Sequence, residues 1–127
     1  VSVLPTSLSN QVGDRVDYVP DYTFQLSAEY RFDWTAEFPG FVRADYNQVG
    51  PSTFTDHSAG IPSWIGFKSD TLSFLNARLG VAHDRWSAEL FGENLLNENG
   101  NQDALAVAGF GARPRPRVLG VKIGASF

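Results

Sequence analysis

The sequence predicts an all-β fold: an antiparallel meander of about five long strands that belongs to a large transmembrane β-barrel. Three observations lead to this prediction. Apolar residues alternate with polar ones over long stretches, as happens when successive side chains point to opposite faces of a sheet. Eight charged residues inside these stretches fall on the polar parity. Long and short connections alternate along the chain, as they do in outer-membrane barrels.

The first part of the chain divides into a loop and two strands. Residues 1–20 have no sustained period, and we expect them to be an extracellular loop. Residues 21–32 alternate most clearly, and at ~3.3 Å per residue they span about 40 Å, which suits a tilted strand crossing a bilayer. A short turn at residues 33–37 leads into a second strand at residues 38–48.

The middle of the chain is predicted to hold a long loop and a third strand. Residues 49–69 are rich in Gly, Pro, Ser and Thr, which indicates a loop. Residues 70–82 form the third strand, although Leu72 and Phe74 break its alternation. Residues 83–85 are a tight turn.

The last part of the chain repeats this arrangement. Residues 86–96 are the fourth strand, residues 97–116 are another long loop, and residues 117–127 are the fifth strand. If the strand at 117–127 ends on the periplasmic side, every short turn lies there as well. The strands of residues 21–127 therefore form one barrel segment, which we expect to be a piece of a longer protein.

Eight charges inside the strands, four acids and four bases, fall on the parity opposite the apolar one. A Lys or Arg facing lipid at mid-membrane costs about 2–4 kcal/mol, so a barrel directs such residues toward its lumen. Two roles remain open for them: a wall of mutually paired charges, or contacts that bind a plug or steer a substrate. The expected lumen-facing charges are Glu29, Arg31, Arg43, Asp45, Arg78, Glu89, Glu93 and Lys122.

Several segments resemble TonB-dependent outer-membrane receptors. Residues 116–127 look like the closing strand of such receptors, and Arg113-Pro114-Arg115-Pro116 resembles the run that precedes it. Asp21-Tyr22-Thr23-Phe24 resembles a segment entering a descending strand. Glu93-Asn94-Leu95-Leu96-Asn97 is similar to the receptor Asn-Leu-Phe-Asp segment, with Leu and Asn in place of the usual Phe and Asp.

This resemblance implies the C-terminal strands of a plugged barrel of about 22 strands in the outer membrane of a Gram-negative bacterium. It further implies TonB-driven import of a bulky nutrient such as an iron–siderophore complex. The implied partners are outer-membrane lipid, the rest of the barrel and the plug domain in the same chain, the TonB complex, and the barrel-assembly machinery.

Two further sets of residues are candidates for function. The closing strand resembles the signal read by the barrel-assembly machinery, which would consist here of Val121, Ile123, Ala125 and Phe127. Loop aromatics are candidate ligand contacts at the extracellular mouth, and these are Phe54, Trp64, Phe67 and Phe110.

The sequence argues against other chemistry. Asp56-His57-Ser58 has triad residue types, but adjacent residues cannot form a triad. The spacing of Asn97, Asn99, Asn101 and Asp103 is that of a calcium loop, which lacks its turn glycine here because the sixth position is Gln102. We therefore expect no enzyme activity, no cofactor and no metal.

Other classes of protein stay open as alternatives. The 14 acidic residues against 10 basic ones argue against nucleic acid as a partner. The barrel would alternatively be a passive porin or an autotransporter translocator. A third possibility is a soluble β-sandwich binding module.

Overall fold

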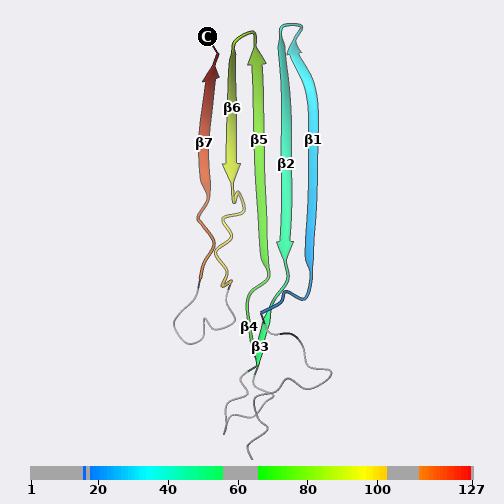
Figure 1. Ribbon diagram of the computed structural model, residues 1–127, viewed down its shortest axis with the longest axis vertical. Helices are drawn as coiled ribbons and strands as arrows, with labels where there is room; N and C mark the ends of the chain where they lie inside the picture. Colours follow the sequence, from blue (N-terminus) through cyan, green and yellow to red (C-terminus); the bar gives the residue numbers. More distant parts are fainter. Residues whose placement is uncertain (1–15, 17, 56–65, 103–111, 127) are drawn as a thin grey trace, which may run out of the picture.

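Five antiparallel strands form one sheet in the order β1-β2-β5-β6-β7 (Figure 1). The computed structural model describes residues 16, 18–55, 66–102 and 112–126, with residues 54–55 and 66–67 described by their backbone alone. Strands that follow one another along the chain are neighbours in the sheet, and the described residues contain no helix, which confirms the predicted all-β meander. The five strands are β1 (Thr23–Thr35), β2 (Phe38–Val49), β5 (Leu72–His83), β6 (Trp86–Glu93) and β7 (Val118–Ala125).

A second, two-stranded sheet extends the β2–β5 hairpin. It consists of β3 (Thr53–Thr55) and β4 (Gly66–Lys68), so the prediction of a continuous loop over residues 49–69 is wrong at these strands. Each strand has three residues, too few to show a period in the sequence. Ser52 and Ser69 link the two sheets, because the Ser69 hydroxyl accepts the Ser52 N–H at 2.8 Å and both side chains are buried.

Most strand boundaries lie one or two residues from the predicted ones, and the ends of β1 and β6 each differ by three. β1 continues to Thr35 through an irregularity between Asp33 and Thr35, so the first turn is shorter than predicted. β6 ends at Glu93 rather than at residue 96, because Asn94 takes the left-handed conformation with φ 50°. Extended pairing cannot continue through a residue in that conformation.

The two ends of the sheet have different connections (Figure 1). The β1–β2 and β5–β6 hairpins and the C-terminal end of β7 lie together at the top of the view, and the longer connections lie at the bottom. We call these the hairpin end and the loop end. This separation is the one predicted from the alternating loop lengths.

The register keeps the Asp, Glu, Lys and Arg side chains of the five strands on one face of the sheet. One row of paired residues crosses all five strands and is entirely apolar or aromatic: Tyr30, Val42, Leu79, Leu90 and Val121. We call this the apolar face. The next row begins with Glu29, which pairs with Arg43, which in turn pairs with Arg78. We call this opposite surface the charged face.

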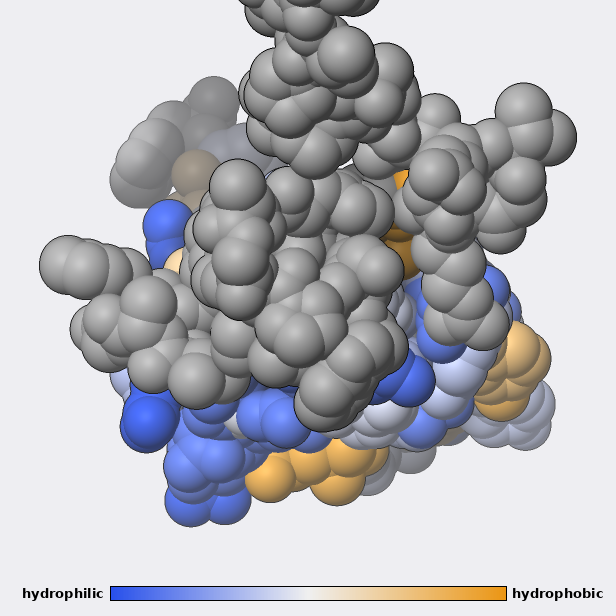
Figure 2. Space-filling model, turned by 90° about the horizontal axis from the view of Figure 1, so that it is seen from below, coloured by the Kyte–Doolittle hydropathy of each residue, from blue (hydrophilic) through white to orange (hydrophobic). Residues whose placement is uncertain are grey.

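The apolar face has no second layer packed on it within the described residues. Its side chains stay open, with Ile123 80 % exposed and Tyr30 67 % exposed. Figure 2, seen from the loop end, shows hydrophobic residues along the lower margin of the molecule. The one buried hydrophobic side chain among the described residues is Leu72, at 5 % exposure. As far as the structure describes the chain, the sheet is therefore a single layer without an internal core.

Two phenylalanines on the charged face lie over glycines of the neighbouring strand. A Cβ added to Gly80 would come within 2.2 Å of Phe41, its cross-strand partner. A Cβ added to Gly120 would come within 2.4 Å of Phe91, which is likewise its partner. Glycine inside a strand often marks such a close approach. Each ring covers the backbone that the missing side chain leaves open.

We predict that Gly80→Ala destabilises the full-length protein by about 1–3 kcal/mol, because the new methyl overlaps the Phe41 ring. Equilibrium urea unfolding of the folded protein measures this loss. Gly124→Ala is the matched control, since its Cβ would meet only the Ser87 hydroxyl at 3.0 Å. Phe41→Leu should restore part of the stability in the Gly80→Ala background, and no restoration would contradict the overlap.

Candidate functional site

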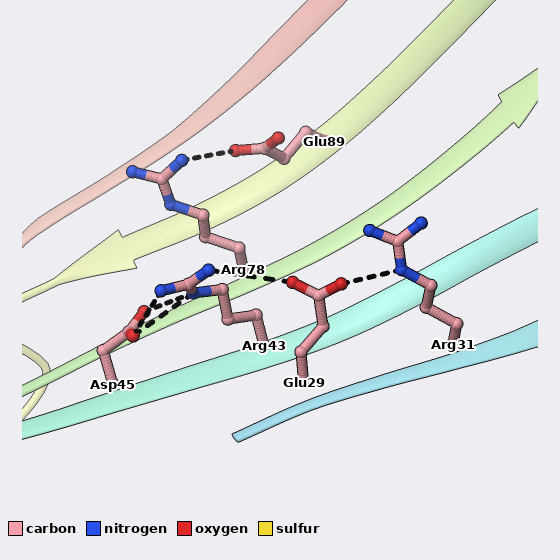
Figure 3. A network of polar contacts seen from close by, with 6 residues as sticks. All are labelled: Glu29, Arg31, Arg43, Asp45, Arg78 and Glu89. Atoms are coloured by element: carbon pink, nitrogen blue, oxygen red, sulfur yellow. Dashed lines mark hydrogen bonds and ion pairs between the residues drawn. The ribbon is translucent and has the colours of Figure 1, made fainter. Parts of the chain in front are cut away.

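All eight charges predicted from the strand parity lie on the charged face. The register places Glu29 opposite Arg43, Ser27 opposite Asp45, and Glu89 opposite Lys122. Figure 3 shows six of these side chains rising from β1, β2, β5 and β6 toward the same side. None of the eight shares a face with Leu26, Leu79 or Ile123.

On β1 and β2 these charges form a continuous chain of ion pairs (Figure 3). Arg31 Nε lies 2.8 Å from Glu29 Oε1, and Arg43 Nη1 lies 3.7 Å from Glu29 Oε2. Arg43 also donates two hydrogen bonds of 2.9 Å to Asp45, from Nε to Oδ2 and from Nη2 to Oδ1. Two parallel N–H donors on one carboxylate make the strong form of this pair. This half of the face satisfies its own charges.

The half of the charged face on β5 to β7 is more loosely paired. Arg78 Nη1 is 3.7 Å from Glu89 Oε1, and that oxygen is buried without a hydrogen-bond donor among the described residues. The Lys122 ammonium lies 5.1 Å from the centre of the Phe91 ring, a cation–π distance, rather than on Glu89. A shallow hollow of about 410 Å³ lies between the two halves, lined by Glu29, Phe41, Arg43, Asp45, Arg78 and Glu89.

An aromatic belt runs across the apolar face at the hairpin end. The Tyr30 and Phe32 rings stack at 5.7 Å, and Trp34 meets Phe32 edge-on at 4.9 Å. Further along the belt, Phe38 stacks on His83 at 4.4 Å. His83 was expected in a solvated turn. It instead ends β5, opposite Trp86, and its Nδ1 lies 2.8 Å from the Glu37 carbonyl oxygen.

The belt borders an apolar hollow of about 480 Å³ on the same face. Trp34, Phe38 and Trp86 line its hairpin side, and Leu79, Leu90 and Val121 line the rest. At the loop end the same face carries a second aromatic pair, Phe24 and Tyr46, with ring centres 6.2 Å apart. The apolar face thus has aliphatic side chains in its middle and aromatic rings at both ends.

The remaining predicted site residues are only partly described. Val121, Ile123 and Ala125 lie on the apolar face of β7, while Phe127 lies outside the described residues. Phe54 and Phe67 are backbone partners across the β3–β4 pair, so these two candidate ligand contacts are neighbours. Trp64, Phe110 and the Asp56-His57-Ser58 stretch lie outside the described part of the chain.

Asn94 joins three segments at the loop end, a role that the sequence reasoning missed. Its Nδ2 donates to the Glu98 carbonyl at 3.0 Å and to the Arg115 carbonyl at 2.8 Å, and its Oδ1 accepts the Glu98 N–H at 2.8 Å. Its own N–H donates to Asn76 Oδ1 on β5 at 2.9 Å. Asparagine tolerates the left-handed conformation, so an Asn in the sequence is a signal that a strand can end there.

Glu98 continues this polar assembly against the end of β5. Its Oε1 accepts the N–H groups of Asn99 and Gly100, and its Oε2 accepts the Ser73 N–H at 3.0 Å. The backbone N–H of Gly100, followed by those of Ser73 and Asn99, lowers the pKa of the Glu98 carboxyl. The Glu98 carboxylate thus takes the place of a backbone carbonyl as the acceptor for the Ser73 N–H of β5.

The described residues contain few groups suited to other chemistry. No cluster of three His, Cys, Asp or Glu among them has the arrangement to hold a metal ion. Across residues 16, 18–55, 66–102 and 112–126, no helix is long and apolar enough to span a membrane.

We predict that Asn94→Asp destabilises the protein by about 1–3 kcal/mol, because a carboxylate cannot donate to the Glu98 and Arg115 carbonyls. Chemical unfolding measures the loss. Asn97→Asp is the matched control, since Asn97 also has a positive φ, 54°, but an exposed side chain. Equal losses in the two variants would contradict a special role for Asn94.

We also predict that Glu98 makes the stability of the loop end depend on pH. Because folding lowers its pKa, its contribution is present above the ordinary Glu pKa of about 4.3 and is lost as the pH falls through the lower folded value. Unfolding measured across the acidic range should show a shallower pH dependence in Glu98→Gln than in the wild type. An unchanged slope would contradict the prediction.

Comparison with known proteins leaves the family open. No protein-family model matches the sequence, and no solved structure matches the chain. The two dissimilar faces of the sheet and the motif resemblance carry the function proposed below.

Proposed function

We propose that this chain is part of the wall of an outer-membrane β-barrel, with its apolar face toward lipid and its charged face toward the lumen. The observation that carries the proposal is that every Asp, Glu, Lys and Arg of the five strands lies on the face opposite the row of Tyr30, Val42, Leu79, Leu90 and Val121. A soluble sandwich would need a second layer over residues such as Leu26 and Ile123, which are 59 % and 80 % exposed.

The dimensions of the sheet support a lipid environment. β1, β2 and β5 have 12 or 13 residues, more than the roughly 9–11 that a tilted transmembrane strand requires. β6 and β7 have eight each, and beyond the end of β6 the Leu95 N–H still donates to the Leu75 carbonyl of β5 at 2.8 Å. Aromatic rings at both ends of the apolar face match the girdles found at membrane interfaces.

Within this class of protein, we favour an active transporter that imports a bulky nutrient such as an iron–siderophore complex, driven by TonB. The resemblance of residues 93–97 and 113–127 to TonB-dependent receptors supports this choice. Within residues 93–97, Asn94 also has a structural role, because it joins β5 to the segment that precedes β7. The charged face would then meet the lumen and its plug, and no bond of the substrate would be made or broken.

The lipid-facing assignment predicts different outcomes at two adjacent residues. Leu26→Lys should lower the free energy of unfolding in lipid vesicles by about 2–4 kcal/mol, since it places an ammonium in hydrocarbon. Ser27→Lys, one residue away on the charged face and opposite Asp45, should cost much less. Equal costs, or a folded monomer extracted into buffer without detergent, would contradict the assignment and favour a sandwich.

The transport assignment needs its own test. Uptake of a labelled iron–siderophore complex should fall when the full-length gene is deleted, and it should fall equally when the cells lack TonB. Uptake that persists without TonB would indicate a passive porin. A translocated passenger domain in the full-length protein would indicate an autotransporter.

A further inference from the structure

Asn99 and Gly100 form the one Asn-Gly step of the sequence. They lie in residues 94–102, which run beside the end of β5 and are held to it by backbone and side-chain bonds. Asn99 is exposed, so water reaches its side-chain amide. This step was not among the sites predicted from the sequence.

An Asn-Gly step is chemically reactive. The backbone nitrogen of the glycine loses its proton and attacks the asparagine Cγ, forming a new C–N bond. The bond from Cγ to the side-chain nitrogen breaks and ammonia leaves, which closes a five-membered succinimide. Water then opens this ring at either carbonyl, giving aspartate or isoaspartate. Glycine favours the reaction because it has no side chain to hinder its nitrogen.

The structure explains why a glycine stands at this reactive position. A Cβ at residue 100 would lie 2.9 Å from Leu72 Cδ2 and 3.1 Å from Asp70 Cβ. Leu72 is the one buried hydrophobic side chain among the described residues, so it has little room to move away. A larger residue would remove the reactive step only by disturbing this packing.

The Glu98 carboxylate lies directly against the reacting nitrogen. Its Oε1 accepts the Gly100 N–H at 2.9 Å and the Asn99 N–H at 3.0 Å. Removing the Gly100 proton would place two negative charges at hydrogen-bond distance, and like charges disfavour that ionisation. The same bonds hold the turn in one conformation.

We propose that Asn99 is a site of spontaneous deamidation and that the Glu98 carboxylate sets its rate. The reaction needs only water and releases only ammonia. It does not depend on the transport function proposed above.

Deamidation at Asn99 would loosen the segment from β5. Isoaspartate adds a methylene to the backbone between Glu98 and Asn101, and either product adds a negative charge next to Glu98. Asn101 donates its N–H to Asp70 Oδ2 at 2.8 Å, and its carbonyl accepts the Asp70 N–H at 3.0 Å. A longer backbone cannot keep these bonds and the Glu98 bonds together.

The experiment follows conversion at each asparagine by peptide mass spectrometry while the folded full-length protein is kept in mildly alkaline buffer. Asn99 should convert faster than Asn97 and Asn101 of the same segment. Glu98→Gln keeps the size of the side chain and an oxygen acceptor but removes the charge. It should speed conversion at Asn99 about tenfold, equivalent to one pKa unit at the Gly100 nitrogen.

Asp70→Asn is the control for simple loosening, because it weakens the bond to Asn101 and leaves the Glu98 carboxylate in place. It should speed conversion less than Glu98→Gln does. Equal acceleration in the two variants would assign the effect to mobility and overturn the role of Glu98. Conversion at Asn99 no faster than at Asn97 and Asn101 would overturn the site itself.

Discussion

The fold depends on keeping one register through five paired strands. Because side chains alternate along a strand, a slip of one residue in any pair would move a charge to the apolar face and an aliphatic side chain to the charged face. The ion pair of Glu29 and Arg43 opposes such a slip between β1 and β2, and on the same face the rings of Phe41 and Phe91 over their glycines oppose it between β2 and β5 and between β6 and β7. Register is thus specified from the charged face as well as from the apolar one.

The strands end in different ways at the two ends of the sheet. At the hairpin end the chain turns back directly, and the aromatic belt covers the last pairs of residues. At the loop end side chains replace backbone partners, with Asn76, Asn94 and Glu98 satisfying groups that a strand would otherwise pair. Buried backbone groups need such partners, and small polar residues that accept positive φ supply them at little steric cost.

A single-layer sheet with one apolar face has to find its nonpolar surroundings outside itself. Leu72 is buried by the loop end rather than by a second sheet, so the few core contacts of the described residues stabilise the connections and leave the apolar face exposed. Lipid on one face and the remainder of a barrel at the β1 and β7 edges would supply what the sheet lacks. In the proposed barrel, the apolar face of the sheet would contact lipid and would need no second layer.

The sequence by itself determined the all-β class, the order of the five long strands and the shared face of the eight predicted strand charges, because period-two alternation is local and needs no knowledge of partners. The sequence predicts one long loop over residues 49–69 and therefore misses β3 and β4. Strands of three residues form only when a neighbouring hairpin aligns them. The tertiary structure alone decided that His83 joins Phe38 and that Glu98 caps β5, because such contacts join residues 25 or more positions apart. Contacts of that kind depend on register, and register exists only once the strands have paired.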